Sequence, residues 1–146
     1  MIERSIATWH RAHEVSRRLE TIPGIGVITA TAVATLVSDA TALRSARVFA
    51  GWVGLAPRLS GTGGKVQLGR ISKAGNRYLR RLLTIGVTSL VRNARRSPEK
   101  TGWITALLAR RPTRVVITAV ANKLARIVGA VLSREEHFRQ PQTAAA

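Results

Sequence analysis

Apolar residues recur every three to four positions through most of the chain, the spacing typical of amphipathic helices. The clearest case is residues 76–93, where one side carries Leu79, Leu82, Leu83, Gly86 and Leu90. A second case is residues 113–132, whose predicted inward side carries Ile117, Val120, Leu124, Ile127, Val128 and Val131, with Lys123 and Arg126 facing out. These patterns predict two long helices that share a core.

The remaining segments also favour helices. The pattern over residues 1–20 predicts one helix. A turn containing Pro23 ends this helix, because proline and glycine cannot continue it. We expect further helices over residues 27–37 and 41–53, and Pro98 marks the start of another. Residues 54–69 are glycine-rich and predict an irregular loop, with room for a short hairpin near 65–68. The predicted fold class is all-α, with a body over 21–134 and a disordered tail over 135–146.

Charge narrows the choice of partner. The chain has 24 Lys and Arg against 7 Asp and Glu, a net charge of +17. Residues 40–98 contain no acid, so nothing there neutralises the cations. Such a surface fits a polyanion, and DNA is the leading partner. An anionic membrane would favour one basic amphipathic helix instead, so we expect no membrane contact.

The chain has no cysteine, which excludes disulfides and thiolate metal sites and agrees with a reducing, cytoplasmic setting. No secretory leader is visible at the N-terminus, and the apolar runs look too short to span a bilayer. The seven acids form no recognisable metal-ligand pattern, so we expect no metal or other cofactor in this chain.

The turn Ile22-Pro23-Gly24-Ile25-Gly26 resembles a helix-hairpin-helix motif. Gly24, Ile25 and Gly26 would let the backbone approach a DNA phosphate, and the following helix would offer free N–H groups. Arg44 and Arg47, on the next predicted helix, could reach the same DNA backbone. The alternative is a tight turn between two packed helices, and the sequence leaves both open.

Ser72 is the candidate nucleophile, because it lies among basic residues that could polarise a phosphodiester. We expect these residues to bind phosphates: Arg70, Lys73, Arg77, Arg80 and Arg81. Ser72 could instead cap the following helix. No general base is evident nearby, since His10 and His13 lie far back in the sequence.

The glycine-rich segment between Arg58 and Lys65 lacks the spacing of a nucleotide-binding P-loop. We interpret it as a loop that contacts nucleic acid through Arg58 and Lys65. Ser60 within it is a weaker nucleophile candidate than Ser72, since its glycine neighbours fix its position poorly.

Two stretches resemble one family closely. Residues 51–58 read Gly-Trp-Val-Gly-Leu-Ala-Pro-Arg, and residues 69–76 read Gly-Arg-Ile-Ser-Lys-Ala-Gly-Asn. With the matches over 21–26, 60–65 and 122–132, they resemble the C-terminal domain of the insertion-sequence 110/116/902 transposases, relatives of the pilin-gene DNA invertases. The resemblance covers nearly all of residues 19–138.

The resemblance implies a DNA recombinase in which Ser72 is the nucleophile. It also implies a separate N-terminal RuvC-like domain that holds Mg²⁺ on four acids, a connecting coiled-coil helix and a structured guide RNA. Because this sequence lacks such a domain, residues 1–20 would be the end of the connecting helix. Strand cleavage would then need a partner that carries the RuvC-like domain, or an oligomer. The alternative is a non-catalytic DNA- or RNA-binding remnant or regulator of a full-length transposase.

Overall fold

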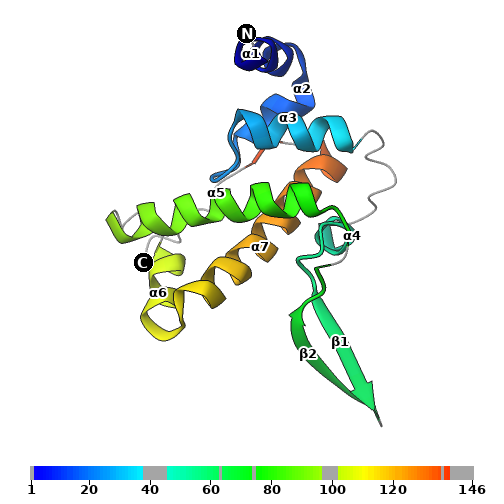
Figure 1. Ribbon diagram of the computed structural model, residues 1–146, viewed down its shortest axis with the longest axis vertical. Helices are drawn as coiled ribbons and strands as arrows, with labels where there is room; N and C mark the ends of the chain where they lie inside the picture. The colour runs from blue at the N-terminus through cyan, green and yellow to red at the C-terminus, as the bar shows by residue number, and fades with distance from the viewer. Residues whose placement is uncertain are drawn as a thin grey trace.

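The computed structural model describes residues 2–37, 46–62, 64–73, 75–96, 102–135 and 137–138, with side chains omitted for 58–62 and 65–69. Within these ranges the chain forms seven helices and one two-stranded hairpin (Figure 1). In order they are α1 (Ile2–Ala12), α2 (Glu14–Glu20), α3 (Val27–Leu36), α4 (Ala46–Trp52), β1 (Pro57–Thr62), β2 (Lys65–Ile71), α5 (Arg77–Arg96), α6 (Gly102–Arg110) and α7 (Thr113–Arg134). The predicted all-α class is confirmed.

The core forms where α5 and α7 cross, with α4 packed on α7 and the α1–α3 layer on one side (Figure 1). Fully buried side chains at this crossing include Leu83 and Val87 of α5, Val120 and Val128 of α7, and Phe49 of α4. Both long helices were predicted within a few residues of their ends, because their apolar stripes are complete. Lys123 and Arg126 are exposed, as expected.

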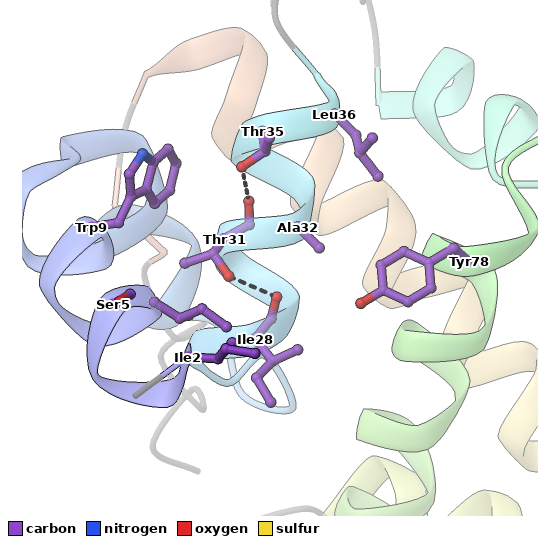
Figure 2. Close-up of a pocket in the computed structure, with 10 residues that line it drawn as sticks. Ile2, Ser5, Trp9, Ile28, Thr31, Ala32, Thr35, Leu36 and Tyr78 are labelled. Carbon is purple, nitrogen blue, oxygen red and sulfur yellow. Dashed lines mark hydrogen bonds between the residues drawn. The ribbon is translucent and has the colours of Figure 1, made fainter.

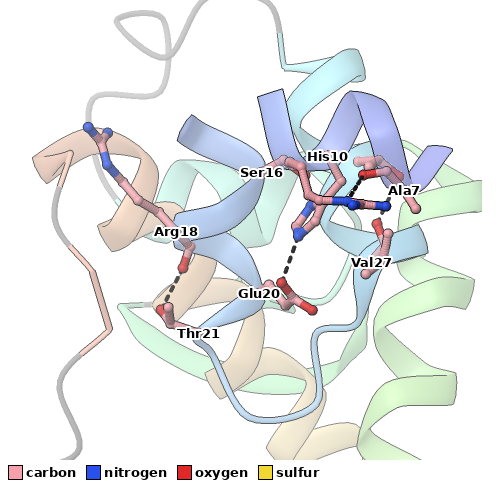
Figure 3. Close-up of polar contacts among 9 residues, drawn as sticks. Ala7, His10, Ser16, Arg18, Glu20, Thr21 and Val27 are labelled. Carbon is pink, nitrogen blue, oxygen red and sulfur yellow. Dashed lines mark hydrogen bonds and ion pairs between the residues drawn. The ribbon is translucent and has the colours of Figure 1, made fainter. Parts of the chain in front are cut away.

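Residues 1–20 form two helices, so the prediction of one continuous helix was wrong. The break lies at His13, whose backbone is extended (φ −110°, ψ 114°). Across the break, the buried His10 ring of α1 contacts the Ser16 hydroxyl through Nδ1 and the Glu20 carboxylate through Nε2, each at 2.6 Å (Figure 3). These contacts between α1 and α2 fix the bend, and apolar spacing alone does not reveal them.

Residues 57–71 form an antiparallel hairpin, which is longer than the short hairpin near 65–68 that the sequence allowed within a predicted irregular loop. Thr62 pairs with Lys65 at the tip and Pro57 pairs with Ile71 at the base, with a register shift between residues 57 and 59. Gly64 in the connecting turn has φ +83°, a left-handed conformation that suits glycine. The hairpin projects away from the helices (Figure 1).

Helix α7 corrects the expectation that no apolar segment is long enough to span a bilayer. It has 22 residues, and an 18-residue window within it has a mean hydropathy of 1.8, so length and composition alone would allow a membrane span. Half of this stretch is buried inside the fold, where α7 packs against α2, α4, α5 and α6. This packing accounts for its apolar residues as those of a core helix.

Candidate nucleic-acid interface

The segment that carries Ser72 is fixed against the end of α4 by a row of hydrogen bonds. Five consecutive carbonyl oxygens, at residues 52–56, each accept one bond from another part of the chain. The pairs are Trp52 O with Asn76 N (2.9 Å), Val53 O with Arg80 Nη1 (3.4 Å), Gly54 O with Lys73 N (3.0 Å), Leu55 O with Asn122 Nδ2 (2.6 Å) and Ala56 O with Ser72 N (2.9 Å). This row, here called the 52–56 carbonyl row, holds the backbone on both sides of Ser72.

Two residues in this segment have left-handed backbone conformations. Gly75 has φ +89°, and a Cβ at this position would lie 1.7 Å from the carbonyl oxygen of Trp52. Lys73 has φ +54°, which is uncommon for a residue with a side chain. Backbone strain of this kind is often found at functional sites, where the surrounding structure maintains it.

Asn76 is the N-cap of α5, because its Oδ1 accepts a hydrogen bond from the backbone N–H of Leu79 at 3.0 Å. The alternative in which Ser72 caps this helix is therefore excluded. Ser72 lies four residues earlier, and it is half-buried rather than enclosed in the core. Its position is compatible with access from solvent.

The cations expected around Ser72 are found on the segments next to it. Arg70 is the residue before the last in β2, Lys73 follows Ser72, and Arg77 and Arg81 lie on the first turns of α5; all four are exposed. Arg80 is half-buried, and its guanidinium donates to the Val53 carbonyl. The sequence has no Asp or Glu from residue 40 to residue 98, and among the residues that the structure describes no ion pair involves these side chains, here called the Ser72 cation cluster.

The other predicted basic contacts are only partly described. Arg47 is exposed on α4. Arg58 lies in β1 and Lys65 in β2, but the structure describes only their backbones. The prediction for Arg44 lies outside the described residues. Of the tail predicted to be disordered over 135–146, the structure describes residues 135, 137 and 138, and the Phe138 N–H donates to Thr21 Oγ1 at 3.2 Å; the rest of the tail lies outside the described residues.

The 21–26 turn is packed against the middle of α5. Gly24 has φ +91°, and a Cβ there would lie 2.8 Å from Leu90 Cδ1. A Cβ on Gly86 would in turn lie 2.1 Å from the Gly24 carbonyl oxygen. Ile25 is only 5% exposed, and its N–H donates to the Ile22 carbonyl. Gly24 and Ile25 therefore serve the packing of the turn, as the tight-turn alternative supposed.

Gly26 differs from these two residues. It is exposed, it is the N-cap of α3, and a Cβ added to it would meet nothing within 4 Å. A phosphate contact at this turn would thus fall to Gly26 and the first N–H groups of α3. The turn meets α5 about 15 Å along the helix axis from the Ser72 cation cluster, at 1.5 Å per residue.

An apolar groove of about 840 Å³ lies between α1, α3 and the first turn of α5 (Figure 2). Tyr78 on α5 and Ile28 on α3 line it while remaining 55% and 57% exposed. Sequence reasoning missed this groove, because its three walls come from segments far apart in the chain. No local motif could have indicated it.

Metal-binding groups are not assembled in the part of the chain that the structure describes. No three His, Asp or Glu side chains there lie close enough together to hold a metal ion. The His10, Ser16 and Glu20 contacts resemble a hydrolase triad in residue type only. Ser16 is 0% exposed, so no substrate can reach its hydroxyl.

Comparison with known proteins identifies the relatives of this chain. The sequence model of the transposase IS116/IS110/IS902 family matches residues 16–101. A probable family 20 transposase of Pseudomonas aeruginosa is 46% identical over 139 residues, which cover 94% of this chain and 41% of the relative. Putative transposase y4pF/y4sB of Sinorhizobium fredii is 40% identical over 97% of this chain and 37% of its own length.

The transposase for insertion sequence element IS1328 of Yersinia enterocolitica is 41% identical, over 94% of this chain and 41% of its own length. The chain therefore spans about two fifths of the length of these curated relatives. The matched region includes the 52–56 carbonyl row, Ser72 and the first turns of α5.

Proposed function

Because the chain belongs to the IS116/IS110/IS902 family of insertion-sequence transposases, we propose that it binds DNA and supplies a serine nucleophile for strand exchange. One observation carries the proposal. The half-buried Ser72 is held by the 52–56 carbonyl row, with exposed cations on either side and no carboxylate in the surrounding sequence.

DNA binding follows from the unneutralised charge of the Ser72 cation cluster. Arg70, Lys73, Arg77 and Arg81 present charged donors to solvent, and guanidinium groups bind phosphate oxygens through paired hydrogen bonds. Arg77 and Arg80 also lie in the first turn of α5, where the helix dipole disfavours cations. A phosphate anion at this end of α5 would offset the repulsion among the cations and their repulsion by the helix dipole.

The proposed reaction is transesterification. The Ser72 oxygen attacks the phosphorus of a DNA phosphodiester while the bond from phosphorus to one sugar oxygen breaks. A serine–phosphate ester replaces the original ester, and the hydroxyl proton passes through solvent to the departing sugar oxygen. No oxidation or reduction is involved. The surrounding guanidinium groups would stabilise the extra negative charge that develops on the phosphoryl oxygens.

Activation of Ser72 must come from outside this region, because residues 40–98 offer no carboxylate or histidine as a base. The described residues do not fit a metal ion, so the Mg²⁺ implied by the family resemblance would belong to another part of the transposase. The proposal includes three further partners: a RuvC-like domain, a structured guide RNA and a second copy of the chain. It places the reaction in the cytoplasm.

The test is a chimera in which this chain replaces the matching segment of the Pseudomonas aeruginosa relative. Incubation with the DNA of that element should yield a protein–DNA adduct that survives denaturing detergent and phenol extraction. The adduct should disappear in Ser72→Ala and persist in the control Ser60→Ala. An undiminished adduct in Ser72→Ala would refute the assignment.

The second candidate is a DNA- or RNA-binding regulator without catalytic activity. The absence of Asp, Glu and His from residues 40–98 of the sequence favours it, since binding needs only the cations. The same chimera separates the two functions. Salt-sensitive DNA binding with no adduct from any variant would support the regulator.

A further inference from the structure

The solvent face of α5 carries arginines at both ends. Its buried residues, Leu79, Leu83, Val87, Val91 and Ala94, define the side that faces the core. At 100° per residue, the arginines on the opposite side fall within about 100° of one another. They are Arg77, Arg81, Arg92, Arg95 and Arg96, and all are exposed. The charged face thus continues well beyond the Ser72 cation cluster.

A second group of cations gathers where α5 ends, α6 ends and α7 begins. The Arg95 guanidinium donates to Thr113 Oγ1 at 2.8 Å, which ties the last turn of α5 to the first residue of α7. We call the exposed arginines around this contact the distal arginine cluster: Arg92, Arg95, Arg96, Arg110, Arg111 and Arg114. None of them pairs with a carboxylate among the residues that the structure describes.

Helix electrostatics explain only part of this cluster. Arg95 and Arg96 in the last turn of α5, and Arg110 in the last turn of α6, interact favourably with the negative ends of those helices. Arg92 lies before the last turn of α5. Arg114 lies in the first turn of α7, where the helix dipole repels a cation. The cluster therefore contains charges that the fold alone does not stabilise.

We infer that the distal arginine cluster is a second phosphate-binding surface, and that one double-stranded nucleic acid lies along α5 from Ser72 to this cluster. This inference rests on the proposed function at the Ser72 end. The 20 residues of α5 span about 28 Å, and arginine side chains at both ends extend that reach. One turn of duplex is about 34 Å long, so both ends can meet the same face of one duplex.

The middle of α5 supports contact at two points. No lysine or arginine occurs between Arg81 and Arg92, and the exposed residues there include Ile85 and Ser89. A duplex backbone that touches the protein once per turn needs cations only at the two ends. Figure 1 shows the two ends of α5 on opposite sides of the core, one beside α4 and the hairpin and the other beside α6.

The test compares two triple variants of the full chain with equal charge. The distal variant is Arg92→Gln, Arg96→Gln and Arg111→Gln, which retains Arg95 because it holds Thr113. The control is Arg4→Gln, Arg11→Gln and Arg17→Gln, three exposed arginines of α1 and α2. Circular dichroism should show the same helix content in both.

Fluorescence anisotropy measures the affinity for a duplex DNA of about 30 base pairs between about 50 and 200 mM salt. The distal variant should bind about a thousandfold more weakly at the lowest salt, because the contribution of three phosphate contacts vanishes only at about 1 M salt. Its log–log salt slope should fall by about 2.7, since each phosphate contact contributes about 0.9. The control should keep a slope close to that of the unchanged chain, and binding should saturate at one duplex per chain.

Equal losses in the distal and control variants would overturn the inference, because net charge alone would then explain binding. Two duplexes per chain would overturn the single-duplex arrangement. A duplex RNA of the same length distinguishes the source of the phosphates: a loss confined to RNA identifies RNA as the ligand, and a loss on DNA identifies DNA. If the Ser72→Ala chimera still forms its adduct while the distal loss is seen, the nucleophile assignment fails and this surface stands.

Discussion

Gly75→Ala tests whether the 52–56 carbonyl row holds the Ser72 segment in place. Gly75 has φ +89°, which costs an L-residue about 1–2 kcal/mol. The new methyl group would also lie 1.7 Å from the Trp52 carbonyl oxygen, far inside van der Waals contact. The segment must therefore move away from α4.

That movement breaks the hydrogen bond from Asn76 N to Trp52 O, which is worth about 1 kcal/mol. The free energy of unfolding should fall by at least about 2–3 kcal/mol, the sum of this bond and the backbone strain. Urea unfolding followed by circular dichroism measures it, and the midpoint should fall with little change in slope.

Gly64→Ala is the matched control, because Gly64 is also left-handed (φ +83°) while a Cβ there meets nothing within 4 Å. It should cost no more than the backbone strain, about 1–2 kcal/mol. DNA affinity should fall in Gly75→Ala, since Ser72 and Lys73 move with the segment. Equal destabilisation by the two substitutions would refute the close contact with Trp52.

Two further predictions concern the 21–26 turn and the cap of α5. Gly26→Ala should cost at most about 1 kcal/mol, because alanine is a poorer N-cap than glycine, and it should weaken DNA binding severalfold. Gly24→Ala should destabilise the fold more, because its φ is +91° and its Cβ would press on Leu90. Unchanged DNA affinity in Gly26→Ala would remove the turn from the interface. Asn76→Ala should lower the free energy of unfolding by about 1 kcal/mol through loss of the cap, and Asn76→Asp should retain most of it in the same urea titration.

The long helices and the charged segment could be predicted from sequence, since each depends on local spacing. The predicted stripe from Leu79 to Leu90 gives the inward side of α5 in part. Leu79 and Leu83 are buried, whereas its other members are half-buried, and the buried side continues through Val87, Val91 and Ala94. The cations around Ser72 are close together because they are close in the chain. The same holds for the turn at Gly24, whose breaking residues are adjacent.

Features that depend on distant contacts could not be predicted. The bend at His13 follows from the contact between His10 and Glu20, across two helices. The Leu55 carbonyl accepts a hydrogen bond from Asn122, 67 residues later in the chain. No pattern in either segment predicts this bond. The sequence predicts a loop over residues 54–69 with only a short hairpin near 65–68, because the glycines there hide the alternation of the two longer strands.

The packing of the turn also changes how its motif is understood. A helix-hairpin-helix reading assigns Gly24, Ile25 and Gly26 to the DNA backbone as one unit. In the structure, the first two pack against α5 and only Gly26 has open space around it. Glycines that look alike in the sequence are thus needed at their positions for different physical reasons.

The central claim is that the cations around Ser72 bind the phosphates of a nucleic acid. The most direct measurement is the salt dependence of duplex DNA binding by the triple variant Arg70→Gln, Arg77→Gln and Arg81→Gln, beside the same substitutions at Arg4, Arg11 and Arg17. We predict that the log–log slope falls by about 2.7 in the first variant and stays unchanged in the second. Equal slopes in the two variants would contradict it.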